Sequence, residues 1–326
     1  MVLNHPASLF LASSRKRIEV AAAVLQRPDG SFLLAQRPAG KVYAGYWEFP
    51  GGKIENRETA AEALSRELHE ELGVDIVRAY PWITRDYDYE HAAVRLRFYR
   101  VMQWSGDLHG RENQQFAWQQ PGAVTVSPLL PANGPILSAL ALPMRYGISN
   151  AGEVGVQAFL DSLERALHSG LRLVQIREKT LSTAIRFEVA KRTLELARAH
   201  AAYVLINGDD ELAKRLGVQG VHLTAAHLME TRERPCFEIV GASCHNELEL
   251  AQAAQLGLDF VVLGPVHETP THPGAATLGW ARFATLLADY PLPVYAVGGL
   301  RERDLQDAWK AGAHGIAAIR SCWSDV

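Results

Sequence analysis

The second half of the chain alternates short apolar runs with amphipathic segments, and this alternation constrains the fold more than any other feature. Buried parallel strands are short apolar runs, whereas crossover helices carry apolar residues at a period of 3.6. The clearest expected helices cover residues 156–169, 183–200 and 246–256. The expected strands cover residues 145–149, 173–177, 202–207, 220–223, 239–244, 260–264, 294–299 and 315–320. Eight strands joined by crossover helices predict a (β/α)8 barrel.

The first half has a different organisation. Strand-like runs cover residues 18–25, 31–36 and 93–103, and a Pro-Asp-Gly turn separates the first two. A chain of 326 residues is long enough for two domains with separate cores. Because the pattern changes near Leu142-Pro143, we expect a loose N-terminal tail at 1–15, a first domain at 16–142 and a second domain at 143–326.

Residues 52–74 combine a predicted helix with a high density of glutamate. Thr59 followed by Glu62 is a capping-box start, and Gly73 is a typical helix stop. We therefore expect a helix over residues 59–72. Its apolar stripe at helical period consists of Ala61, Leu64, Leu68 and Leu72.

Glu67, Glu70 and Glu71 lie beside this stripe, since successive helical residues are rotated by about 100°. Glu67 and Glu71 repel each other across one turn, and partial burial increases the cost. A divalent cation relieves this repulsion, because Mg²⁺ takes oxygen ligands from a few carboxylates, water and substrate phosphates. A solvated acidic helix is the alternative interpretation of the glutamates alone.

The segment from Gly52 through Glu58, Arg66-Glu67-Leu68 and Glu70-Glu71 to Gly73-Val74 resembles the complete Nudix box. Nudix enzymes are Mg²⁺-dependent hydrolases of diphosphate linkages, with Mn²⁺ as a substitute metal. The resemblance implies an α/β/α sandwich with a mixed sheet. It implies metal binding by Glu67, Glu70, Glu71 and the backbone of Gly51 and Gly52. Arg66 is expected to orient a carboxylate, Glu58 to act through water or as a loop anchor, and Glu112 to be an extra catalytic ligand or base, or only a loop acid.

Residues 16–140 also resemble the MutT-type 8-oxo-dGTP diphosphatases in the order of their local motifs. In that subfamily an asparagine in a Pro-Ala-Asn-x-Pro segment pairs with the oxidised guanine, and Asn133 matches it. An amide offers both a donor and an acceptor to a purine edge. The other implied substrate contacts are Arg37, Glu48, Phe49, Pro50 and Gly51. Val42 departs from the pattern, because some relatives carry a histidine there.

Residues 144–321 resemble thiamine phosphate synthase and the related thiazole tautomerase, both TIM barrels. The resemblance implies an anion site made by Gln175, Arg177, Lys179, Asn207, Ser243, Gly298, Gly299 and Ser321. Two aspartates that hold Mg²⁺ in the synthase are replaced by Gly208 and His227, and Asp209 stands one residue late. We therefore expect a phosphate-binding barrel without synthase activity. His245 keeps a tautomerase-like role open, with a plain helix N-terminal residue as the alternative.

Only five residues follow Ser321, so the eighth barrel helix is expected to be missing or very short. Apolar strand faces would then need a cover. We expect either the first domain or a second subunit, as in a homodimer, to pack there.

Composition excludes several classes of protein. The net charge of −3 gives no basic surface for polymeric nucleic acid. No apolar stretch approaches 18 residues, so no membrane span is expected. The three cysteines show no metal-binding spacing and cannot all pair, which fits the reducing cytoplasm.

Three functional hypotheses follow. The first is Mg²⁺-dependent hydrolysis of the nucleoside triphosphate 8-oxo-dGTP to 8-oxo-dGMP and pyrophosphate. The second keeps this chemistry but takes a diphosphate from the thiamine pathway. The third makes the barrel a module that senses a phosphorylated ligand and adjusts the hydrolase.

Overall fold

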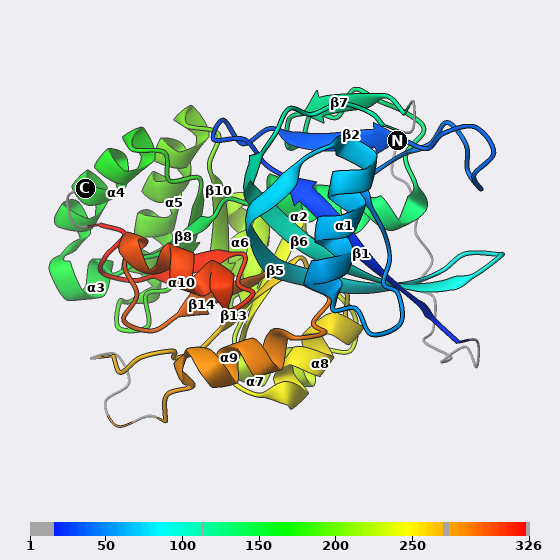
Figure 1. Cartoon of the computed structure of the whole chain (residues 1–326). Helices are drawn as coiled ribbons and strands as arrows, with labels where there is room; N and C mark the ends of the chain where they lie inside the picture. Colours follow the sequence, from blue (N-terminus) through cyan, green and yellow to red (C-terminus); the bar gives the residue numbers. More distant parts are fainter. Residues whose placement is uncertain (1–15, 112–113, 270–273, 275, 324–326) are drawn as a thin grey trace.

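The computed structural model describes residues 16–111, 114–269, 274 and 276–323, and it divides into a sheet-rich N-terminal half and a closed barrel (Figure 1). Glu112 and the expected tail at 1–15 lie outside the described residues. The barrel and the N-terminal sheets together confirm the predicted α/β fold class.

A four-stranded mixed sheet forms the centre of the N-terminal half, in the order β4-β1-β6-β5. β1 (Ile18–Leu25) pairs in parallel with β6 (Ala93–Ser105) and antiparallel with β4 (Gly51–Lys53). The expected strand at 18–25 is therefore confirmed, and the one at 93–103 extends to Ser105. A second sheet has the order β3 (Trp47–Glu48), β2 (Phe32–Gln36) and β7 (Phe116–Gln119).

Helices cover both faces of the mixed sheet. α1 (Ala60–Leu72) packs Leu64, Leu68 and Leu72 against one set of β1 side chains, and α2 (Gly134–Ala141) packs against the other. The expected stripe needs one correction: Ala61 is exposed, and Ala63 is buried in its place. Ala63 packs in the same buried cluster as Leu64, Leu68 and Leu72, so the buried face of α1 is displaced toward the side of the helix that carries Glu67 and Glu71.

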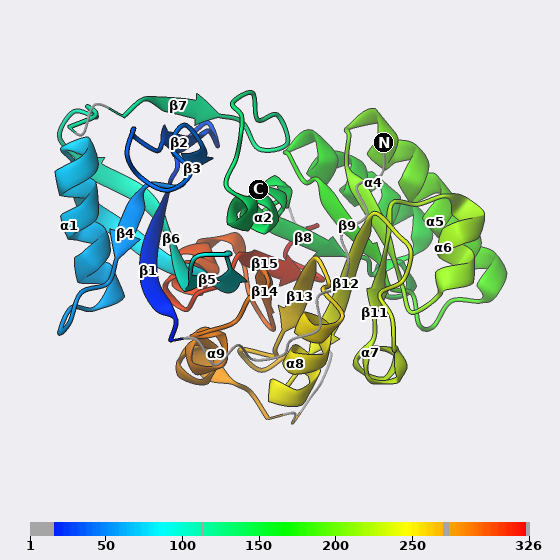
Figure 2. The same cartoon turned by 90° about the vertical axis from the view of Figure 1, so that its right-hand side faces the viewer.

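β5 (Asp75–Asp88) is a long edge strand that sequence periodicity did not predict. Its pairing with β6 shifts register three times, and it carries Pro81, so its alternation is interrupted. In Figure 2, β5 lies between the rest of its sheet and the barrel, while α1 lies on the far side. Its buried residues therefore reflect contact with the second half of the chain.

The barrel consists of eight parallel strands that close between β15 and β8. The strands are β8 (Arg145–Ile148), β9 (Leu173–Ile176), β10 (Tyr203–Asn207), β11 (Gly220–Leu223), β12 (Ile239–Cys244), β13 (Phe260–Leu263), β14 (Val294–Val297) and β15 (Gly315–Ala318). The surrounding helices are α3 (Ala151–Val154), α4 (Val156–His168), α5 (Thr183–Ala199), α6 (Asp210–Leu216), α7 (Ala225–Glu230), α8 (Glu247–Gln255), α9 (Gly279–Leu287) and α10 (Leu305–Lys310). Every expected strand is present, with ends that differ by two residues at most. Tyr146, Phe260 and Tyr295 pack against one another inside the barrel, with ring centroids 5.1–5.6 Å apart.

The N-terminal sheet docks on the end of the barrel where strands begin. Arg97 pairs with Asp289 at 2.6 Å, and the Thr84 amide donates to the Tyr290 carbonyl at 3.1 Å. Arg100 is fully buried there and donates to the carbonyl oxygen of His314 at 3.0 Å. The guanidinium also lies over the ring of Trp82, 4.2 Å from its centroid. The two halves therefore share a buried, hydrogen-bonded interface.

Trp323 covers the outer face of the barrel between β8 and β15. A side chain at Gly147 would collide with the Trp323 ring, whose indole nitrogen donates to the Ile148 carbonyl at 3.0 Å. The ring also packs edge-on against Phe159 of α4. The first domain contacts the barrel's end instead of this face, so its expected role as a cover is wrong, and a second subunit at this face stays a prediction.

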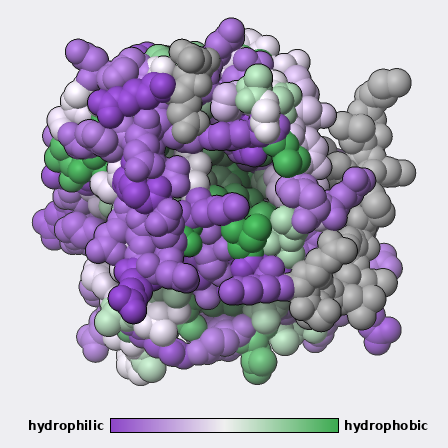
Figure 3. Space-filling model, turned by 45° about the vertical axis from the view of Figure 1, so that its right-hand side comes forward, coloured by the Kyte–Doolittle hydropathy of each residue, from purple (hydrophilic) through white to green (hydrophobic). Residues whose placement is uncertain are grey.

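One face of the molecule is mainly hydrophilic and is hollowed near its centre, where the floor is hydrophobic (Figure 3). None of the helices in the described part of the chain combines the length and apolarity needed to cross a membrane.

Candidate functional site

Two glutamates of α1 face the backbone of β4. Helix α1 begins with the expected capping box between Thr59 and Glu62 and ends at Gly73, whose φ of 70° suits glycine. A Cβ at Gly52 would lie 2.1 Å from the Glu67 carboxyl carbon, so Gly52 leaves room for that carboxylate. The Gly51 amide donates to Glu71 Oε2 at 3.3 Å. The glycine pair and the two carboxylates thus form one compact site.

Arg66 donates to three acids of the helix and its preceding loop. Its guanidinium donates to Glu58 at 2.9 and 3.0 Å, to Glu67 at 2.8 Å and to Glu70 at 3.3 Å. The hydrogen bond from Arg66 lowers the pKa of Glu58. Glu70 is more than half exposed and lies at the edge of this group. Arg66 therefore orients Glu67 and anchors the loop at Glu58, as the resemblance implies.

Glu71 is the most perturbed acid of the site. Burial raises its pKa to about 7, and the nearby charges of Glu48 and Glu67 act in the same direction, while Lys41 opposes them. A carboxylate that is desolvated and surrounded by like charge favours a proton or a cation.

The donor set fits Mg²⁺, although its ligands are few. Among the residues that the structure describes, no three His, Cys, Asp or Glu side chains converge closely enough to hold a metal ion. Mg²⁺ commonly uses only one or two carboxylates, with water and substrate phosphates completing the octahedron. Glu67, Glu71 and the Gly51-Gly52 backbone provide such a set.

The residues expected to contact a nucleotide lie next to this acidic site. Arg37 donates twice from Nη1 to the Glu48 carboxylate, at 2.6 and 2.7 Å, and from Nε to the Val42 carbonyl at 2.7 Å. Asn133 is buried and donates to the Trp47 carbonyl at 3.2 Å. Phe49 is buried between Phe32 and Phe98, so its ring belongs to the core. Pro50 is also buried, and its carbonyl accepts from the Ala23 amide.

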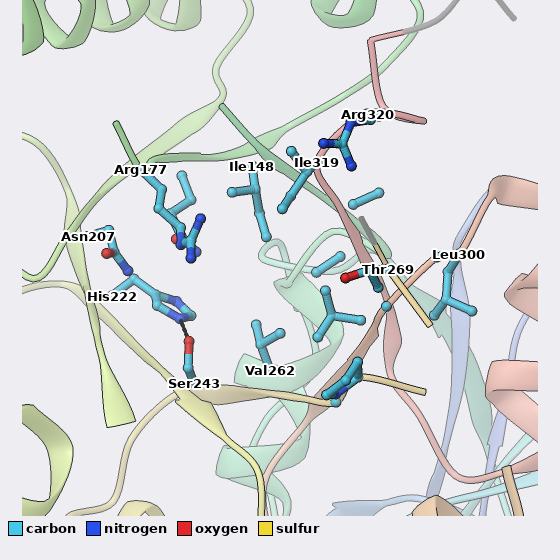
Figure 4. A pocket seen from close by; sticks show the side chains of 18 of the residues that line it. Ile148, Arg177, Asn207, His222, Ser243, Val262, Thr269, Leu300, Ile319 and Arg320 are labelled. Carbon is cyan, nitrogen blue, oxygen red and sulfur yellow. Dashed lines mark hydrogen bonds between the residues drawn. The ribbon is translucent and has the colours of Figure 1, made fainter. Parts of the chain in front are cut away.

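A second site is a cavity of about 470 Å³ at the end of the barrel where the strands finish. All eight residues expected to bind an anion line it, namely Gln175, Arg177, Lys179, Asn207, Ser243, Gly298, Gly299 and Ser321. Arg177, Asn207, His222 and Ser243 lie on one side, and Ile319 and Arg320 lie on the other (Figure 4). Arg177 lowers the pKa of Lys179, because the two like charges face the same space. The described lining of the cavity contains no aspartate or glutamate.

The synthase-type metal site does not fit the barrel. Gly208 offers no side chain, and the carboxylate of Asp209 is already used. One oxygen accepts from Arg186 at 3.0 Å, and the other accepts from the Leu212 amide at 2.9 Å and caps α6. His227 lies within α7 and is not among the cavity-lining residues. His245 lines the cavity, with its Nδ1 2.9 Å from Glu249 Oε2.

Sequence reasoning missed a buried polar network beneath this cavity. Ser243 Oγ lies 2.9 Å from His222 Nε2 (Figure 4). On the other side of the ring, Tyr146 Oη lies 3.2 Å from His222 Nδ1. Gln175 donates to Tyr146 at 3.0 Å. Burial lowers the pKa of His222 to about 3, with Arg177 adding to the effect, so its imidazole is neutral. The position of His222 at the end of an apolar strand was the available signal, because such residues point into barrel sites.

Two family models match separate halves of the chain. The thiamine monophosphate synthase model matches residues 145–322, and the NUDIX domain model matches residues 21–139. The chain belongs to the thiamine monophosphate synthase family. Its N-terminal half is a NUDIX domain of the hydrolase type, so the chain is a fusion of the two.

Individual relatives each resemble one half of the fusion. A thiamine-phosphate synthase of Thermus thermophilus is 36% identical over 170 residues, which cover 51% of this chain and 82% of that protein. A MutT structure from work on Aliivibrio salmonicida and Vibrio cholerae is 30% identical, with a TM-score of 0.33, and the match covers 39% of this chain and 98% of that one. The solution structure of the E. coli ORF135 protein is 39% identical, with a TM-score of 0.33, and the match covers 38% of this chain and 88% of that one.

Proposed function

We propose that the NUDIX domain hydrolyses 8-oxo-dGTP to 8-oxo-dGMP and pyrophosphate with Mg²⁺. The observation that carries the proposal is the placement of Glu67 and Glu71 against the Gly51-Gly52 backbone. Glu71 is desolvated and lies among like charges, which favours a bound cation. When bound, Mg²⁺ would neutralise the phosphates and make the phosphorus more electrophilic.

The protein's own groups would then position the reactants. Glu67 and Glu71 would hold the cation over β4, with Glu70 and Glu112 as further acids of the same machinery. Arg66 would keep Glu67 oriented through its 2.8 Å hydrogen bond. Glu48 links this end of the site to Arg37, so the phosphate and base ends of a nucleotide would be read by adjoining side chains.

Base recognition is assigned to Asn133. Its amide nitrogen already donates to the Trp47 carbonyl, which fixes the orientation of the side chain. A fixed amide can pair with an altered purine edge better than a rotating one, because less entropy is lost on binding. Arg37 supports this pocket indirectly, since both its contacts are to protein groups.

A substrate panel on the full-length protein tests the proposal. We expect kcat/KM to be highest for 8-oxo-dGTP. Asn133→Ala should lower this kcat/KM by roughly 5- to 150-fold while changing dGTP hydrolysis less, in line with about 1–3 kcal/mol for a lost hydrogen bond to a buried group. Ser138→Ala, a half-exposed change on α2, is the matched control. Equal rates on 8-oxo-dGTP and dGTP would overturn the assignment.

The barrel supports a second candidate substrate, a diphosphate from the thiamine pathway. The fusion of the NUDIX domain to a barrel of the thiamine monophosphate synthase family favours it. The same panel includes thiamine diphosphate and a pyrimidine diphosphate. A preference for either one, unaffected by Asn133→Ala, would select this alternative.

For the barrel itself we propose binding of an organic phosphate without synthase activity, in the cytoplasm. Cationic side chains line the cavity, while the positions for metal-binding carboxylates hold Gly208 and His227. Binding of thiazole phosphate measured by calorimetry, with no thiamine phosphate formed in a synthase assay, is the expected result. Synthase turnover would refute it.

A further inference from the structure

An aromatic cluster at the edge of the NUDIX domain contains none of the residues so far assigned. It consists of Tyr43, Tyr46, Tyr87, Tyr89 and His91. The first two belong to the loop between β2 and β3, and the others belong to the tip of the β5–β6 hairpin, which projects from the sheet (Figure 1). Tyr43 joins the two segments, with its ring centroid 5.2 Å from Tyr46, 5.5 Å from Tyr89 and 5.8 Å from His91.

The backbone at Tyr43 is strained. Its φ is 61°, in the left-handed region that bulky residues rarely adopt. Arg37 holds this loop from inside by donating to the Val42 carbonyl and to Glu48. Strain that the surrounding contacts maintain is typical of functional positions. The loop therefore presents the Tyr43 ring in a defined place at an energetic cost.

The cluster adjoins the acidic site through Glu48. Burial chiefly raises the pKa of Glu71 on one side, and it raises the pKa of Tyr89 to about 12 on the other. The charge of Glu48 adds to the rise of both pKa values. Tyr46 directly precedes Trp47, whose carbonyl accepts the hydrogen bond from the Asn133 amide at 3.2 Å. The rings thus border both the predicted phosphate end and the predicted base end of the site.

Aromatic side chains that are only partly buried provide flat surfaces for a planar ring. All three tyrosines nearest the site, Tyr43, Tyr46 and Tyr89, are partly buried rather than enclosed in the core. Stacking of a nucleobase on an aromatic side chain contributes about 1–3 kcal/mol and does not depend on the base's hydrogen-bonding edge. This chemistry complements the edge recognition assigned to Asn133.

We propose that Tyr43, supported by Tyr89, is a stacking residue that binds the planar base of the nucleotide. The proposal rests on the function proposed above and adds a contact to the face of the base. The ligand class it selects is a diphosphate that carries a planar heteroaromatic ring. Tyr43 would act on binding, so its loss should raise KM rather than lower kcat.

Two substitutions at Tyr43 separate the ring from the backbone. Tyr43→Phe keeps the ring, and we expect KM for 8-oxo-dGTP to stay within about twofold, because stacking does not use the hydroxyl. Tyr43→Asn removes the ring but tolerates the left-handed backbone. For this variant we expect KM and the dissociation constant of 8-oxo-dGMP to rise about tenfold or more, kcat to change less than about twofold, and pyrophosphate binding to stay unchanged.

Ala201→Asn is the matched control, because Ala201 also has a positive φ, 49°, in an exposed turn of the barrel. It should leave every nucleotide constant unchanged. His91→Ala, a second exposed variant in the cluster, should raise KM by a smaller factor. Unchanged KM in Tyr43→Asn, or equal weakening of 8-oxo-dGMP and pyrophosphate binding, would overturn the stacking role.

The outcome is distinguishable from failure of the proposed function. If the wild-type protein prefers another diphosphate with a planar ring, the proposed function fails. The KM of Tyr43→Asn relative to wild type, measured on that substrate, still tests the role of Tyr43. If the wild-type protein prefers 8-oxo-dGTP but Tyr43→Asn behaves like wild type, only the stacking role fails.

Discussion

The two candidate sites of this protein carry opposite charge. Several carboxylates lie together in the NUDIX site. Burial and the charges of Glu48 and Glu67 destabilise the charged form of Glu71. The barrel cavity gathers cations, with Arg177 and Lys179 facing the same space and no acid in its described lining. An acidic site requires a cation before it can accept phosphate, whereas a basic site binds phosphate directly.

The difference in charge predicts a difference in chemistry. A metal ion placed among carboxylates can promote attack on phosphorus, so the NUDIX site suits hydrolysis. Fixed cations and backbone amides bind the anion without providing a nucleophile. Under the functions proposed above, the molecule would combine a site for hydrolysis with a site that only binds its ligand.

Distance separates the sites as well. The NUDIX domain docks on the end of the barrel where strands begin, around His314 and Asp289, and the cavity opens where the strands finish. Packed rings of Tyr146, Phe260 and Tyr295 fill the space between. A product of one site would therefore reach the other only through solvent.

The largest expected effect comes from Glu71→Gln. Removing this carboxylate should lower kcat/KM for hydrolysis by about 10³ or more, equivalent to about 4 kcal/mol in the barrier. Thiazole phosphate binding by the barrel should stay the same, because the sites are separate. Glu62→Gln, a change at the exposed start of α1, serves as the control for helix stability. Hydrolysis close to the wild-type rate would remove Glu71 from the metal site.

An intermediate effect is expected for Arg177→Met, which keeps most of the side-chain volume but removes the charge. Loss of a charge-assisted hydrogen bond to phosphate should weaken binding by about 1.5–3 kcal/mol. The dissociation constant of thiazole phosphate should therefore rise roughly 10- to 150-fold. Hydrolysis of the nucleotide should be unaffected. Arg172→Met, whose contacts are to backbone carbonyls at the other end of β9, is the matched control. Unchanged binding in Arg177→Met would contradict the assigned anion site.

The smallest expected effect is the change in ligand binding by the barrel when divalent cations are removed. Chelation of divalent cations with EDTA should stop hydrolysis but change the barrel's dissociation constant for thiazole phosphate by less than about twofold, because fixed cations already neutralise the ligand. Calorimetry in the presence and absence of Mg²⁺ measures this. A strong loss of barrel binding on chelation would show that a metal takes part there after all.

Local patterns predicted most of the barrel and the acidic helix. Strands such as β13 and β15 are apolar along their whole length, and the capping box at Thr59 marks where α1 begins. Side-chain burial in these elements follows their own period, so a single stretch of sequence contains the information. β5 was not predicted, because its burial pattern depends on contact with the barrel more than two hundred residues later.

By itself, then, the sequence determined which residues form the strands of the barrel and which acids share one face of α1, since both depend on neighbours along the chain. Only the tertiary structure decided that Arg100 is buried against His314, that His222 joins Tyr146 to Ser243, and that Tyr43 meets the β5–β6 hairpin. These contacts join residues distant in sequence, and their energies depend on the burial and orientation that the assembled fold imposes.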